Sequence, residues 1–191
     1  GYSSSKIVDR HGRLAKSIDA DGNSICYSYD IDDNCVCVEG PTTTIRTEFD
    51  KYGNRTKLID PDLGEISYAY NGYGELVSQT DSHGTTTFEY DVLGRLTKET
   101  RPDFTYTYSY DNQLKGFMDT KSSSNNTSIA YKYDKYGRTI SETHEMGNRS
   151  FTTRTSYNNI NKPDTISYPS GFKIKLNYYD TGYQQSIHNA K

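Results

Sequence analysis

Several residue types are scarce in this sequence of 191 residues, which contains no Trp, two Met, three Cys and five Pro. Apolar residues make up 32% and the mean hydropathy is −0.91, whereas an ordinary globular domain is roughly 45–50% apolar. No run of about 18 apolar residues occurs, which excludes a membrane-spanning helix. The strong helix formers Ala, Leu and Met are also scarce, so the composition argues against a helical protein.

An excess of charge of either sign is also missing. The 22 Lys and Arg residues and 25 Asp and Glu residues give a net charge of −3, which argues against a general nucleic-acid binder because such proteins need a basic face. Three cysteines are too few for a disulfide scaffold. The run Gly1–Lys6 has no Met and no apolar signal segment, so we expect a piece of a longer protein, with any localisation signal outside it.

Aromatic residues are abundant, with 19 Tyr and 6 Phe making up 13% of the chain. Disordered chains are poor in aromatic residues, and Tyr favours strands. The composition therefore indicates a β protein whose apolar face is built from tyrosine.

The sequence repeats one short pattern, in which an aromatic residue precedes Asp or Asn and a Gly follows three residues later. Tyr90-Asp91-Val92-Leu93-Gly94-Arg95-Leu96 is the clearest copy. The first positions of the copies are Val8, Tyr29, Phe49, Tyr70, Tyr90, Tyr110, Tyr133, Tyr157 and Tyr178, at intervals of 20 to 24 residues. We therefore expect residues 1–191 to be a single array of about nine repeats.

The sequence pattern of each repeat predicts two strands and two tight turns. Aromatic and polar residues alternate before the Asp, as in Phe104–Tyr110, which is typical of a half-buried strand. Asp-x-x-Gly is typical of a type I turn in which Asp caps the turn and Gly adopts the left-handed conformation. The predicted turn residues are Asp9, Gly12, Asp50, Gly53, Asn71, Gly74, Asp91, Gly94, Asp134 and Gly137.

Two imperfect copies support this interpretation, because they carry Asp33 and Asn161 at the Gly position. Asp and Asn tolerate the left-handed region better than other non-Gly residues. The segment Lys121–Thr127 is expected to form a longer, mobile turn.

The predicted fold class is all-β. Nine repeats give an antiparallel meander of roughly 16–18 short strands, and a meander of that length is expected to coil into a spiral sheet.

The Tyr-Asp-x-x-Gly-Arg-Leu unit at this spacing resembles the YD, or Rhs, repeat family, which includes bacterial Rhs and wall-associated polymorphic toxins, B and C components of Tc toxin complexes, and teneurins. The resemblance extends from Val8 to Gln184. It implies a β-sheet shell that encloses or displays a C-terminal toxin-type domain, and a secreted or cell-surface location in a bacterium. The family's toxins end the shell with an Asp-Pro-x-Gly-type self-cleavage motif. The nearest match, Asp60–Gly64, lies where every repeat has a turn, and we interpret it as a turn.

The residue types that often act in catalysis do not form a recognisable catalytic motif in this sequence. An Asp that recurs in every repeat is best explained by the turn, although paired carboxylates are used in glycoside hydrolysis. Asn71–Gly74 is not followed by a helix and is therefore not a phosphate loop. Cys26, Cys35 and Cys37 have no His nearby in the repeat to complete a zinc site. We therefore expect no catalytic residues, metal site or cofactor, and no enzymatic activity.

A disulfide between Cys26 and Cys37 is a further prediction, because a hairpin turn centred near Asp32 would place these residues opposite each other. Cys35 would then lie two residues closer to the turn.

Two classes of function remain open. The first is a structural repeat module whose partners are neighbouring repeats and an enclosed client domain. Further repeats are then expected to pair with the edge strands near Ile7-Val8 and Lys173–Leu176. The second is a carbohydrate-binding or adhesion module that binds glycans with exposed Tyr rows, and a self-assembling surface protein is a further alternative.

Overall fold

The computed structural model describes residues 3–190, which form 18 β-strands and no helix. They divide into two compact units, up to Phe88 and from Glu89 onward. The boundary falls within the ninth strand.

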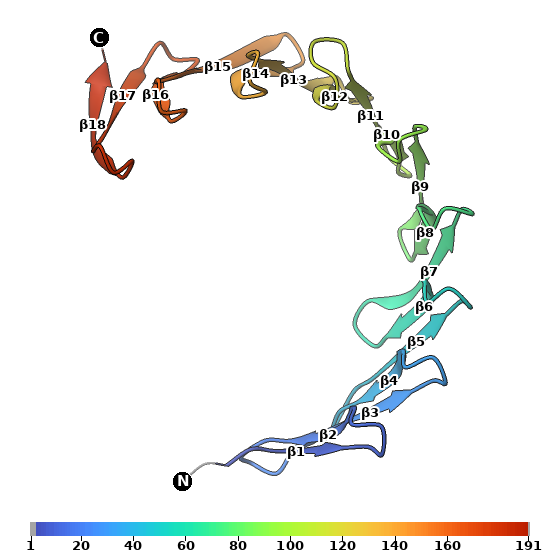
Figure 1. The fold of residues 1–191 in the computed structure, drawn as a ribbon. Coiled ribbons are helices and arrows are strands. Elements are labelled where there is room, and N and C mark those ends of the chain that lie inside the picture. The colour runs from blue at the N-terminus through green and yellow to red at the C-terminus, as the bar shows by residue number, and fades with distance from the viewer. Residues whose placement is uncertain (1–2, 191) are drawn as a thin grey trace. The chain divides into compact units, whose positions relative to one another are not determined.

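The first unit contains nine strands that pair antiparallel in chain order (Figure 1, blue to green). They are β1 (Ser5–Val8), β2 (Leu14–Ile18), β3 (Ser24–Tyr29), β4 (Cys35–Glu39), β5 (Thr44–Phe49), β6 (Arg55–Asp60), β7 (Gly64–Tyr70), β8 (Leu76–Asp81) and β9 (Gly84–Tyr90).

The second unit continues the same connection pattern (Figure 1, green to red). Its strands are β10 (Leu96–Thr100), β11 (Thr105–Tyr110), β12 (Met118–Ser123), β13 (Thr127–Tyr133), β14 (Thr139–Met146), β15 (Arg149–Tyr157), β16 (Pro163–Ser167), β17 (Lys173–Tyr178) and β18 (Gln184–Ala190). The predicted all-β antiparallel meander is confirmed.

Each unit is a single layer of strands, so its apolar residues are half-buried by their neighbours in the sheet. In the first unit Val38 lies opposite Tyr27 and Ile45, and Leu58 lies opposite Ile66. The most buried of the described residues are Leu176, Glu99 and Asp119, at 8%, 8% and 3% exposed. Stability therefore rests on cross-strand pairs and hydrogen bonds, each contributing on the order of 1 kcal/mol or less.

A β-bulge precedes the Asp-x-x-Gly turns and shifts the strand register by one residue. In the β3–β4 hairpin, Ser28 pairs with Cys37, but the next residue, Tyr29, pairs with Cys35. The pairing of Tyr29 with Cys35 would by itself place Cys26 opposite Val38, and the shift moves Cys26 one residue further, opposite Glu39. The expected opposition of Cys26 and Cys37 is therefore wrong, and both are free thiols in this structure, as is Cys35.

The segment Lys121–Thr127 also differs from the expectation of a long mobile turn. β12 continues to Ser123 and β13 begins at Thr127, so the turn between them is short. Hydroxyl groups support the longer strands, since Thr107 Oγ1 and Ser122 Oγ form a 2.8 Å hydrogen bond between β11 and β12. Cross-strand bonds of this kind between Thr and Ser stabilise a sheet.

Candidate functional site

The Asp-x-x-Gly turns lie at one end of the strands and carry the residues that recur in every repeat. In the turn that begins at Asp50, the Oδ1 atom accepts hydrogen bonds from the backbone N–H groups of Tyr52 (2.8 Å) and Asn54 (2.9 Å). Gly53 has φ of 82° and donates its N–H to the carbonyl of Asp50. The hydrogen bond from the Asn54 side chain is the main cause that lowers the pKa of Asp50.

The other predicted turn residues occupy equivalent places. The carboxylates of Asp9, Asp91 and Asp134 and the amide oxygen of Asn71 accept the same two backbone hydrogen bonds. The glycines of these four turns, Gly12, Gly74, Gly94 and Gly137, have positive φ as Gly53 does. Each of these acceptors is thus engaged by its own turn.

Six of the tyrosines that precede a turn connect their repeat to the one before. The hydroxyl of Tyr110 donates to the carbonyl of Leu96, the first residue of β10, at 2.8 Å. Five other tyrosines make the same bond at 2.8–3.0 Å: Tyr29 to Leu14, Tyr70 to Arg55, Tyr133 to Met118, Tyr157 to Thr139 and Tyr178 to Pro163. Sequence reasoning missed this contact, although the regular recurrence of Tyr rather than Phe was a signal for it.

Three arginines that follow the turn glycine make a second connection between repeats. Arg95 donates through Nε to Asp91 at 2.7 Å, and its guanidinium carbon lies 4.4 Å from the centre of the Tyr110 ring in the next repeat. Its two terminal nitrogens bind both carboxylate oxygens of Asp111, at 3.0 and 2.7 Å. The hydrogen bonds from Arg95 are the largest cause that lowers the pKa of Asp111 to about 2.

Arg13 and Arg138 repeat this arrangement. Arg13 stacks on Tyr29 and binds Asp33, and Arg138 stacks on Tyr157 and binds Asn161 at 2.8 Å. Both guanidinium carbons lie 4.5 Å from the ring centre.

In the following repeat, the residue that each of these three arginines binds has positive φ and is not glycine. Asp33, Asp111 and Asn161 have φ of 68°, 69° and 61°. The tolerance of Asp and Asn for the left-handed region is one reason for these residue types at positions 33 and 161. The structure adds a second reason, because each of these side chains receives the arginine of the preceding repeat.

An open groove of about 580 Å³ lies between the Asp50 turn and the Asn71 turn. The residue that corresponds to Arg95 is here Asn54, whose side-chain amide reaches only to Asp50, at 3.0 Å. The lining includes Asp50, Tyr52, Asn54, Tyr68, Tyr70 and Tyr73. Tyr52 and Tyr73 are 77% and 92% exposed, so the groove is bordered by exposed aromatic rings.

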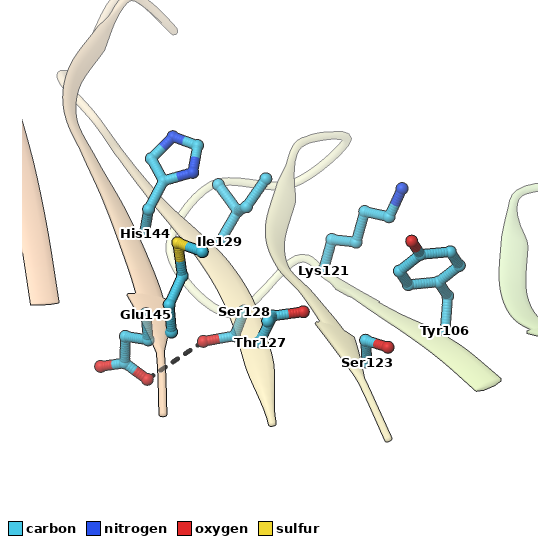
Figure 2. A pocket seen from close by; sticks show the side chains of 9 residues that line it. Tyr106, Lys121, Ser123, Thr127, Ser128, Ile129, His144 and Glu145 are labelled. Carbon is cyan, nitrogen blue, oxygen red and sulfur yellow. Dashed lines mark hydrogen bonds between the residues drawn. The ribbon is translucent and has the colours of Figure 1, made fainter. Parts of the chain in front are cut away.

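A second cavity of about 230 Å³ lies over β11–β14. Figure 2 shows Tyr106, Lys121, Ile129 and His144 on four successive strands around it. Lys121 Nζ lies 4.1 Å from the centre of the Tyr106 ring, and His144 Nε2 lies 2.5 Å from Glu142 Oε1. The hydrogen bond of His144 thus goes to a carboxylate two residues away on its own strand.

Among residues 3–190, no three His, Cys, Asp or Glu side chains are arranged to hold a metal ion. The same part of the chain contains no helix long and apolar enough to cross a membrane. In the turn at Asp60–Gly64, Asp60 Oδ1 accepts hydrogen bonds from the N–H groups of Asp62 and Leu63.

Comparison with known proteins gives one family match and several similar folds. Residues 70–103 match the family model described as RHS Repeat, and no curated protein matches the chain. The crystal structure of TcdB2-TccC3-Cdc42 is similar over 100% of this chain, with 13% identity and a TM-score of 0.58. TcdB2-TccC3-TEV is similar over 98%, with 14% identity and a TM-score of 0.61.

A mutant Tc holotoxin pore from Photorhabdus luminescens is similar over 100% of this chain, with 12% identity and a TM-score of 0.60. The chain spans only 13–14% of the length of these three structures' chains. At this low identity the likeness shows the fold. Together, the RHS repeat matched at residues 70–103 and the fold shared with the Tc toxin structures confirm the resemblance of this chain to the Rhs/YD-repeat family.

Proposed function

We propose that the chain is a non-enzymatic structural module and forms part of a β-sheet shell that encloses or displays a C-terminal toxin-type domain. The observation that carries this proposal is that the recurring side chains bind other parts of the same chain. The turn carboxylates bind their own backbone, and the tyrosines and arginines bind the next or preceding repeat. The same residue types that recur most therefore hold repeats together.

The fold supports a role in assembly with further repeats. A single-layer meander has no second layer to cover its apolar face, and within each unit the main contacts among the described residues are between strands that are consecutive in the chain. The similar structures include a Tc holotoxin pore, and the family resemblance extends the proposal to a secreted or cell-surface location. The partners proposed are neighbouring repeats and an enclosed client domain.

Limited proteolysis of the full-length protein tests enclosure. The C-terminal domain is expected to resist protease in the full-length protein and to be cleaved rapidly when it is produced alone. Equal cleavage rates for the same domain in the two samples would contradict enclosure. Turnover of a glycoside or ester substrate by the 191-residue chain, above that of a heat-unfolded sample, would contradict the non-enzymatic role.

The exposed rings of Tyr52 and Tyr73 favour a second candidate, a carbohydrate-binding adhesion module. Aromatic rings offer apolar faces on which sugar rings can stack, and the groove beside them is large enough for a small glycan. A glycan array separates the candidates, because an adhesion module is expected to bind a defined set of glycans and to lose that binding in a Tyr52→Ala/Tyr73→Ala variant.

A further inference from the structure

Successive turns differ in the side chain that lies between them. In the repeat that begins at Tyr90, the guanidinium of Arg95 lies between the Asp91 carboxylate and the Tyr110 ring. Arg13 and Arg138 occupy the corresponding places in their repeats. In three repeats, therefore, a planar cation stacks on a tyrosine face beside a carboxylate.

The groove between the Asp50 turn and the Asn71 turn has the same two walls without that cation. Asp50 corresponds to Asp91, and Tyr70 corresponds to Tyr110, with its hydroxyl bound in the same way to the first residue of the preceding strand. The amide of Asn54 replaces only the Nε contact, at Asp50 Oδ2. The space that the rest of an arginine side chain fills elsewhere is part of a cavity of about 580 Å³.

The charges at this groove favour a cation. All three side-chain hydrogen bonds of Asp50 come from neutral N–H groups. The nearby cations lie over other rings, Lys51 over Tyr52 at 4.9 Å and Arg55 over Tyr68 at 5.0 Å. The charge of Lys51 also acts on Asp50, as the last of the causes that lower its pKa. Within residues 3–190, none of the cation–ring contacts involves Tyr70.

Another groove between turns offers an internal comparison. It lies between the turns that begin at Asn158 and Tyr179 and encloses about 540 Å³. Its turn begins with a neutral Asn, and its one ion pair joins the lining residues Asp164 and Lys175 at 2.5 Å. This groove is therefore open as well, but its Asp164 carboxylate already has a cation.

We propose that the groove between the Asp50 and Asn71 turns is a binding site for the guanidinium group of an arginine side chain presented by another polypeptide. The guanidinium would stack on the Tyr70 ring and pair with the Asp50 carboxylate, as Arg95 stacks on Tyr110 and pairs with Asp91 within the chain. Arginine fits better than lysine because its planar group stacks on an aromatic ring and donates in the plane at the same time. The exposed Tyr73 ring beside Gly74 borders the entrance.

A titration monitored by NMR tests this site, with N-acetyl-arginine-N-methylamide as the probe and the 191-residue chain as the target. Saturable shifts are expected at the Tyr70 ring and at the amides of Tyr73 and Gly74, in the millimolar range for a single side chain. The neutral citrulline analogue is expected to produce none. Equal shifts with citrulline, or saturable shifts with methyl glycosides at the same resonances, would overturn the proposal and favour a sugar site.

Two variants separate loss of binding from loss of structure. Asp50→Asn removes the charge but keeps the turn cap, because Asn71 caps the next turn in the same way, and affinity is expected to fall at least tenfold. Asn54→Arg places the arginine within the chain and should abolish binding at this groove. Asp30→Asn, at the corresponding position of the preceding turn, is the matched control and should bind as the parent does.

A chemical-rescue experiment gives an independent measurement. Arg95→Ala opens a groove whose natural occupant is known, and low millimolar N-ethylguanidinium is expected to raise its unfolding temperature relative to the same concentration of N-ethylurea. The groove between the Asp50 and Asn71 turns is not a guanidinium site if Asp50→Asn binds the arginine probe with the parental affinity. The same conclusion follows if N-ethylguanidinium stabilises Arg95→Ala no more than N-ethylurea does.

Discussion

Replacing Tyr110 with Phe tests whether the tyrosine hydroxyls hold successive repeats together. The change removes one oxygen atom and leaves the ring in place. That oxygen donates a 2.8 Å hydrogen bond to the carbonyl of Leu96, in a partly buried position. The bond joins the end of β11 to the start of β10 and is independent of the ladder hydrogen bonds between these strands.

The expected loss follows from the value of one partly buried hydrogen bond. A net contribution of roughly 0.5–1.5 kcal/mol is typical, and the carbonyl of Leu96 loses a partner. The unit from Glu89 onward has a size close to 100 residues, for which about 1 kcal/mol lowers the midpoint temperature by roughly 4–8 °C. We therefore expect a decrease of several degrees.

Thermal unfolding followed by circular dichroism measures this decrease, and urea unfolding measures the corresponding change in the free energy of unfolding. Tyr73→Phe is the control, because the Tyr73 ring is 92% exposed and its substitution is expected to change stability by less than about 0.5 kcal/mol. The reasoning would be refuted if Tyr110→Phe and Tyr73→Phe unfolded at the same urea concentration.

The reverse change is available at Phe49, which occupies the same position of its repeat but lacks the hydroxyl. By analogy with Leu96 and Leu14, the acceptor would be the carbonyl of Cys35, the first residue of β4. Phe49→Tyr is expected to raise stability by up to about 1 kcal/mol. A decrease would show that the Phe49 ring does not lie as the tyrosines do.

Two further changes test the turns themselves. Gly137→Ala is expected to destabilise the protein more than Gly12→Ala. Both residues have φ of 80°, a conformation that costs Ala about 1–2 kcal/mol, but only at Gly137 would the new Cβ lie 2.6 Å from Phe117 Cζ. Equal losses of stability in urea unfolding would argue against the clash. The hydrogen bonds from Arg95 lower the pKa of Asp111 to about 2, so Asp111 stabilises the fold above about pH 4 and this contribution is lost as the pH falls toward about 2. Asp111→Asn should therefore reduce the decrease in unfolding temperature over that interval, and an unchanged decrease would contradict the assignment.

The fold was predictable because turn chemistry and strand alternation point to the same element boundaries. The spacing of Asp and Gly placed the turns, and the positive φ of Asp33 and Asn161 was predicted from their position in the repeat. These features depend on residues close together in the chain, so a sequence pattern records them directly.

The register of the hairpins was not predictable at the level of one residue. The pairing of Tyr29 with Cys35 next to the turn already differs by one residue from the register expected for Cys26 and Cys37. The bulge between Ser28 and Tyr29 is a backbone feature that adds one more residue, so Cys37 lies opposite Ser28. The connections between repeats were also missed. Arg95 and Asp111 are 16 residues apart, and their contact depends on the separation of strands in space rather than on any local pattern.

The pairing of each of these arginines with an Asp or Asn of the next repeat has a consequence for how such a gene can change its length. A repeat that carries Arg95 needs a successor that carries a residue such as Asp111. A repeat with Asn54 is followed by one with Gly74, which has no side chain to offer. Duplication or loss of a single unit by recombination would therefore separate matched neighbours, whereas a duplicated pair of units keeps its internal match. We expect the repeats of this chain to be inherited in pairs where an arginine is present.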